Sequence, residues 1–247
     1  MASLYVIAVT LLQLAGIAQL NRPAQPGPLV ENVRFEKGNS IAFARIVNVS
    51  GKDVTGLNLS IEVTFQDGRQ SSYERLVDFL PRMLSYQTLQ LSDNGALHPG
   101  DRWEEQLNLP SRGANNTPIA VSVKLDVAAY SDHTVDVENE PALLRLAGVR
   151  HNQALADQKA AEIINAAAAD DVTPDPLGMA VTQLRAVLEQ ARRKNGEREL
   201  EGELMAIIAN LESRKSDTSR SDLRLYATRK NAEVEILSSH ALFRRSK

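Results

Sequence analysis

The side chains best suited to chemistry are few in this chain and lie far apart. Its four histidines are His98, His133, His151 and His240. No two of them stand in the His-x-x-x-His or His-Glu-x-x-His spacing by which one helix presents zinc ligands. The chain also lacks cysteine, which excludes thiol nucleophiles, thiolate metal sites and disulfides. The sequence therefore predicts no metal centre and no bound cofactor.

The aspartates that stand out belong to predicted turns, where a carboxylate accepts hydrogen bonds from nearby backbone amides. They are Asp67, Asp93, Asp101, Asp132 and the pair Asp170-Asp171. The chain has no Gly-x-Ser-x-Gly elbow, no Walker loop and no Gly-x-Gly-x-x-Gly turn. We name no catalytic residue and expect a protein that is not an enzyme. Because catalytic triads are recognised by geometry, an unrecognised hydrolase is the alternative.

Charge and aromatic content also argue against nucleic-acid binding, since the net charge is −3 and only 4% of residues are aromatic. The basic cluster Arg192-Arg193-Lys194 is followed by glutamates, so we interpret it as part of a solvated face. The second cluster, Arg244-Arg245-Ser246-Lys247, could touch anionic lipid or polymer weakly. We expect Trp103, in an alternating strand, to pack in a core rather than to form a ligand platform.

The N-terminal segment is the strongest indication of where the protein acts. Residues 1–21 carry no charge, and Leu4–Ala18 is an apolar run that ends in small residues. This pattern is typical of a cleaved export signal, here residues 1–18. An uncleaved membrane anchor and a buried core helix are the alternatives, although the run is short for a membrane span. Residues 19–28 follow as a Pro-rich spacer.

Residues 29–139 have the pattern of short strands separated by turns. Val54–Gln66 alternates strictly, and we expect Leu57, Leu59, Ile61, Val63 and Phe65 to face a core, with Asn58, Ser60, Glu62, Thr64 and Gln66 in solvent. Asp67-Gly68 then forms a hairpin turn. Further strands are expected over 41–49, 86–91, 103–109 and 119–127, the last with Ile119, Val121, Val123, Leu125 and Val127 inward. The spacing predicts an antiparallel sandwich of immunoglobulin-like size.

Three turn sequences in this region resemble those of bacterial extracytoplasmic Ig-like modules. They are Val47–Val54, with an Asn before a small-residue turn, Leu97–Asp101, a Leu-x-Pro-Gly-Asp turn, and Tyr130–Thr134, where His133 replaces the Gly of an Asp-Gly-Thr turn. The resemblance covers residues 29–137. It implies a β-sandwich that serves in adhesion, assembly or spacing.

From residue 140 to 247 the pattern becomes helical. Pro141 suits a first helical turn, and residues 143–169 are rich in alanine. The segment 170–176 breaks this helix, and Asp175-Pro176 begins the next. Two apolar stripes predict an antiparallel helical hairpin: Leu177, Val181, Leu184, Leu188 and Ala191, then Leu200, Leu204, Ile207 or Ile208, and Leu211. Ser219 or Ser221 is expected to cap a further short helix through Lys230, with a loose tail after Ser238.

These observations predict an α+β protein: an N-terminal antiparallel Ig-like β-sandwich followed by a C-terminal α-helical hairpin or bundle, after an export signal. We expect an extracytoplasmic, non-catalytic interaction or structural module that binds a protein partner through a sandwich edge or the exposed side of its helices. A homodimer through the C-terminal helices is possible, and membrane attachment requires residues 1–21 to stay uncleaved. The alternatives are an extracytoplasmic enzyme or accessory domain with a site between sandwich and helices, and an anchored spacer.

Overall fold

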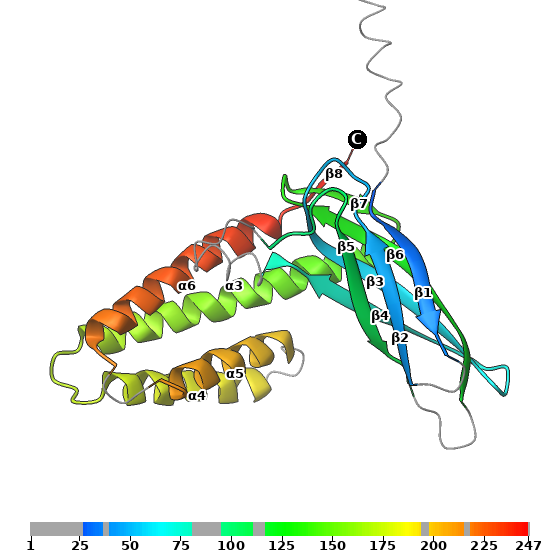
Figure 1. The fold of residues 1–247 in the computed structure, drawn as a ribbon. Helices are drawn as coiled ribbons and strands as arrows, with labels where there is room; N and C mark the ends of the chain where they lie inside the picture. Colours follow the sequence, from blue (N-terminus) through cyan, green and yellow to red (C-terminus); the bar gives the residue numbers. More distant parts are fainter. Residues whose placement is uncertain are drawn as a thin grey trace, which may run out of the picture.

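The structure, a computed structural model, describes residues 27–36, 40–80, 95–110, 117–193, 198–214 and 218–246. Within these residues the chain forms eight strands in two sheets and four helices (Figure 1). The prediction of an α+β protein whose helices follow the sheets is confirmed. The export segment 1–18, most of the spacer 19–28, the expected strand 86–91 and Asp93 lie outside the described residues.

The first seven strands divide between the two sheets. One sheet has the order β1-β2-β5, formed by β1 (Leu29–Phe35), β2 (Ile41–Val47) and β5 (Arg102–Asn108). The other has the order β4-β3-β6-β7-β8, formed by β4 (Gln70–Asp78), β3 (Val54–Phe65), β6 (Pro118–Tyr130), β7 (Thr134–Val137) and β8 (Arg244–Arg245). The pairs are antiparallel except β7 with β8, which is parallel. The prediction of purely antiparallel pairing is therefore wrong at this edge, where the C-terminal segment adds a parallel strand.

The two sheets share one apolar core. The predicted inward set of β3, from Leu57 to Phe65 at every second position, is fully buried. It packs with Ala42, Ala44 and Ile46 of β2 and with Leu107 of β5. Trp103 also packs against this core, edge-on to Phe79 with 5.3 Å between ring centroids. Each fully buried aliphatic side chain of this kind stabilises the fold by about 1.5–3 kcal/mol.

A β-bulge overturns part of the predicted alternation. In the pairing of β3 with β6, Leu59 lies opposite Leu125 and Asn58 opposite Val127, so Asp126 is an extra residue. An extra residue exchanges the two faces of the strand beyond it. Val127 therefore does not join the core between the sheets but packs in a second cluster with Leu146 of the first helix. Asn58, expected in solvent, is fully buried on this same outer face.

Apart from the end of the last helix, the helices begin and end close to the predicted positions. They are α3 (Glu140–Ala169), α4 (Pro176–Arg193), α5 (Arg198–Glu212) and α6 (Arg220–His240). Pro141 lies in the first turn of α3, and the carboxylate of Asp175 accepts a 2.8 Å hydrogen bond from the Gly178 amide at the start of α4. The predicted stripes of α4 and α5 are buried, except that Val181 is only partly buried.

The end of the chain differs from the prediction. Ser219 does cap α6, in a capping box with Asp222, but the helix continues past Lys230 to His240. The tail then forms β8, with the Arg244 amide donating to the His133 carbonyl at 2.9 Å. The buried apolar residues of α6 are sparse, namely Leu223, Ala227 and Leu237, so the apolar pattern predicts too short a helix. The helix nevertheless packs along nearly the whole of α3 (Figure 1).

Helix α3 is the centre of the helical part. It lies between α6 on one side and the α4–α5 pair on the other (Figure 1), and its buried alanines let the other helices approach closely. The N-terminal turns of α3 pack on the outer face of the five-stranded sheet through Ala142, Leu143 and Leu146. None of the helices within the described ranges combines the length and apolar character that a membrane crossing needs.

Candidate functional site

The junction between the sheets and the helices is organised by a buried arginine. Arg150 of α3 is fully buried, and its guanidinium forms a two-pronged ion pair with Asp78, with both contacts at 3.0 Å. The same group donates to the carbonyl of Thr55 at 2.9 Å and to the carbonyl of His240 at 2.9 Å. Arg150 therefore joins β3, β4, α3 and the end of α6.

Gly56 makes room for this arrangement. A Cβ atom at this position would lie 2.7 Å from Nη2 of Arg150 and 3.4 Å from Leu146. The 2.7 Å contact is shorter than van der Waals packing permits. Any larger residue at this position, near the start of β3, would displace the guanidinium from Asp78 and Thr55.

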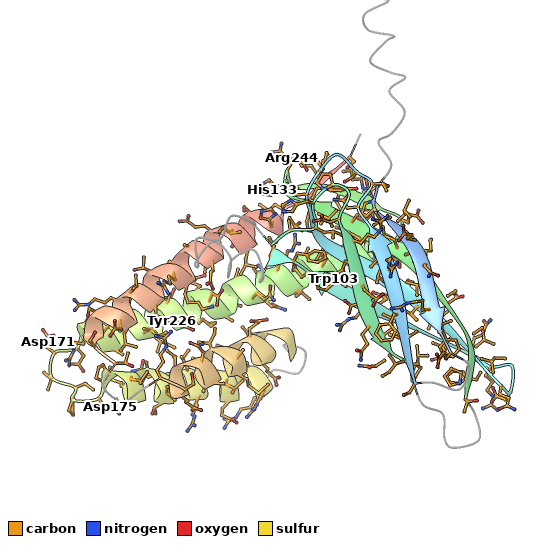
Figure 2. All side chains as sticks on the ribbon, in the orientation of Figure 1. Trp103, His133, Asp171, Asp175, Tyr226 and Arg244 are labelled. Atoms are coloured by element: carbon orange, nitrogen blue, oxygen red, sulfur yellow. The ribbon has the colours of Figure 1, made fainter. Side chains whose placement is uncertain are left out.

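Two of the four histidines meet at the same junction. His133 stands in the β6–β7 turn with φ +64°, a left-handed conformation that favours glycine. Glycine is the residue at this position in the Asp-Gly-Thr turn that the segment resembles. Its ring lies 4.4 Å, centroid to centroid, from the ring of His240 at the end of α6. Figure 2 shows His133 and Arg244 together at this end of the sheet. No local sequence pattern indicates this pair, because its members are 107 positions apart in the chain.

The surroundings of His240 favour its neutral form. Burial, followed by the charges of Arg150 and His133, lowers the pKa of His240 to about 4, and only Asp78 opposes this shift. The Nδ1 atoms of both rings are buried without a hydrogen-bond partner among the described residues. The adjacent guanidinium disfavours a bound cation, and the described residues contain no group of three or more His, Asp or Glu side chains arranged to hold a metal.

The remaining histidines are not part of this cluster. His98 is half-buried beside the turn in which Gly100 has a φ of +86°, and its Nδ1 lies 2.9 Å from Asp53 Oδ1. His151 lies exposed on α3.

Four of the predicted turn aspartates have the expected structural role. Asp67 accepts from the Arg69 amide, Asp101 from the His98 amide and Asp132 from the Thr134 amide, at 3.0, 3.1 and 3.0 Å. Asp170 likewise accepts from the Val172 amide at 3.0 Å. These carboxylates are held by local backbone.

A second buried charged cluster lies between α3 and α6. Lys230 Nζ is 2.8 Å from Asp157 Oδ1 and 2.6 Å from Glu233 Oε2. Burial alone would lower the pKa of Lys230, but the charges and hydrogen bonds of the two carboxylates raise it above its ordinary value. Lys230 is therefore a charged residue inside a helix interface, which explains why the apolar pattern of α6 fades there.

The outer surface of the α4–α5 pair carries a groove of about 400 Å³. Four residues at positions i, i+3, i+4 and i+7 come from each helix. They are Arg185, Leu188, Glu189 and Arg192 of α4, and Met205, Ile208, Ala209 and Glu212 of α5. The floor is apolar, and Met205 is 45% exposed.

Charged side chains bound the groove at both ends. Arg185 Nη2 reaches Glu212 Oε1 across it at 2.5 Å. At the other end Arg192 pairs with Glu189 at 2.6 Å and lies 3.6 Å from the sulfur of Met205. Arg192, interpreted above as part of a solvated face, thus borders the groove. These contacts also place α4 and α5 antiparallel, as predicted.

No protein family, curated protein or solved structure matches the chain. The function must therefore be argued from the two sites themselves. The junction is closed around Arg150, whereas the α4–α5 groove is open and lined by exposed side chains.

Proposed function

We propose that this protein is an exported, non-catalytic interaction module that acts through the α4–α5 groove. The observation that carries the proposal is an open groove with an apolar floor and charged ends on the helical part. Such a combination, an apolar centre within a polar rim, is the general composition of protein-binding surfaces. Met205 suits this role, because its unbranched thioether adapts to different partners.

The two sheets are proposed to be an Ig-like module that carries the helices. If β1 to β7 correspond to strands A, B, C, C′, E, F and G, the sheets have the orders A-B-E and C′-C-F-G, which is close to Ig topology. The Asn48 turn supports the resemblance further. Its amide donates to the carbonyls of Lys52 and Leu97 at 2.8 and 2.7 Å, so one buried side chain fixes two of the three matching turns.

Export rests on the apolar run within residues 1–21. Cell fractionation followed by intact mass measurement tests it. A soluble extracytoplasmic species that begins near Gln19 supports export with cleavage, and a full-length species in the membrane fraction supports the anchored spacer instead. A full-length cytosolic species contradicts both.

Photo-crosslinking in cells tests the contact surface. A photoreactive amino acid at position 205 should give a crosslinked protein adduct, because the groove would be occupied. The same amino acid at Leu225, which is 52% exposed on α6, is the matched control. Adducts at 225 but none at 205 would refute the proposed surface.

The junction supports the alternative of an enzyme, since His133, His240, Arg150 and Asp78 converge there. We favour the interaction module because Arg150 is fully buried and held by Asp78, Thr55 and His240. A substrate could reach it only if the sheet and helices separated.

A further inference from the structure

The α4–α5 pair has two faces, and only one of them is covered in the described structure. On the inner face, α3 lies against both helices through its alanine-rich surface. On the outer face, the groove is formed by the same two helices and is open. The fold therefore already contains one helical layer packed on this pair, and the outer groove offers the equivalent position on the opposite side.

The charges of the groove indicate what occupies it. Its lining contains two arginines and two glutamates, so the net charge is zero. A strongly acidic or strongly basic partner would meet as much repulsion as attraction. A surface with paired opposite charges is instead complementary to itself.

We propose that the occupant is the same groove of a second copy of this chain, related by a twofold axis that runs along the groove. This inference rests on the proposed function and names the partner of the same surface. Such an axis places α4 of one copy against α5 of the other. Arg185 then faces Glu212 of the second copy, and Glu212 faces Arg185 of the second copy. A twofold interface of this kind repeats every contact, so these two pairs form a closed ring of four alternating charges.

The apolar floor supplies the attraction and the charges supply the register. Ile208 and Ala209 on one copy then lie opposite Leu188 on the other, and Met205 lies opposite the stem of Arg192, so both grooves lose water together. Four helices, two from each copy, then form two packed layers, an arrangement in which such short helical hairpins find sufficient apolar contact.

Sedimentation equilibrium of the chain as recovered from cells, over a range of concentrations, tests the inference. The wild-type protein should be a dimer that dissociates on dilution. Met205→Lys should weaken the dimer about tenfold or more, because it places a second cation beside Arg192 of both copies in the buried floor. Leu225→Lys on α6 should leave the dimer unchanged. Circular dichroism should show that both variants fold, since both side chains are exposed.

Two charge reversals give a sharper test. Arg185→Glu surrounds the twofold axis with four glutamates in a homodimer, and Glu212→Arg surrounds it with four arginines, so each variant alone should be monomeric. An equimolar mixture should recover a dimer, because every facing pair is again of opposite charge. A role of these residues within one chain only would not produce this recovery.

The remaining outcomes are decisive as well. A wild-type monomer at every concentration, a dimer that survives Met205→Lys, or a mixture that stays monomeric would overturn the inference. If the chain is monomeric but position 205 crosslinks to a different protein in cells, the self-association falls while the proposed function stands. If neither contact occurs, both fall.

Discussion

His240 makes the stability of the junction depend on pH. The folded protein holds this imidazole neutral, with its pKa lowered to about 4 by burial and then by Arg150 and His133. In the unfolded chain the group has its ordinary pKa of 6.5. Between these two values the unfolded state binds one more proton than the folded state, so the free energy of unfolding falls as the pH falls.

The size of the effect follows from the two pKa values. Each pH unit in this window removes about 1.4 kcal/mol from the free energy of unfolding. Between pH 7 and pH 4.5 the contribution of His240 amounts to about 2 kcal/mol. The contribution of neutral His240 to the free energy of unfolding is fully present above pH 6.5, and it is lost progressively as the pH falls toward 4.

The assay is urea unfolding at pH 7 and pH 4.5 of the wild type, His240→Gln and His151→Gln. Other groups also titrate in this range, so the comparison between variants carries the prediction. His240→Gln should lose about 2 kcal/mol less than the wild type on acidification, because Gln cannot be protonated. His151→Gln, at an exposed site on α3, should follow the wild type. If all three proteins lose stability in parallel, the junction does not hold His240 neutral.

Three further predictions test structural contacts, each by urea unfolding at pH 7. Arg150→Met should cost about 3–5 kcal/mol because Asp78 is left charged and buried, and adding Asp78→Leu should recover part of this loss; a double variant less stable than Arg150→Met alone would contradict the reasoning. Asn48→Ala should cost about 2–3 kcal/mol, since the carbonyls of Lys52 and Leu97 lose their buried donor, and an unchanged midpoint would refute this role. Ser219→Ala should cost about 1 kcal/mol through loss of the α6 cap, and a neutral result would show that the capping box adds no stability.

Local patterns in the sequence predict the elements well where one periodicity dominates. The alternation of β3 places five apolar side chains in the core, and the stripes of α4 and α5 are buried as their spacing indicates. The turn expected at Asp132 also forms, and His133 within it has a φ of +64°. These features depend on neighbours within a few residues.

Features that depend on tertiary contacts were not predictable in this way. The bulge at Asp126 leaves the sequence alternation intact and yet moves Val127 to the other face. Lys230 interrupts the apolar stripe of α6, although Asp157 neutralises it from another helix.

The candidate sites show the same limitation. The inner stripes of α4 and α5 stand out in the sequence because they are apolar. Most residues of the outer groove lie outside these stripes and are charged or small, so no apolar pattern indicates them. Met205 is the one signal that could have been noticed, since it is a large apolar residue outside the buried stripe of α5. The charged ends require the antiparallel pairing of the helices, which brings Arg185 and Glu212 together across 27 residues.

Oxidation of Met205 by hydroxyl radicals tests most directly the claim that this groove is a protein-binding surface. The side chain is 45% exposed in the single chain. We predict that its oxidation slows several-fold as the concentration of the recovered protein rises through the dimer range, while oxidation of Leu225 on α6 stays constant. Met205 should also be protected in cells. Equal oxidation of Met205 when dilute, when concentrated and in cells would contradict the account.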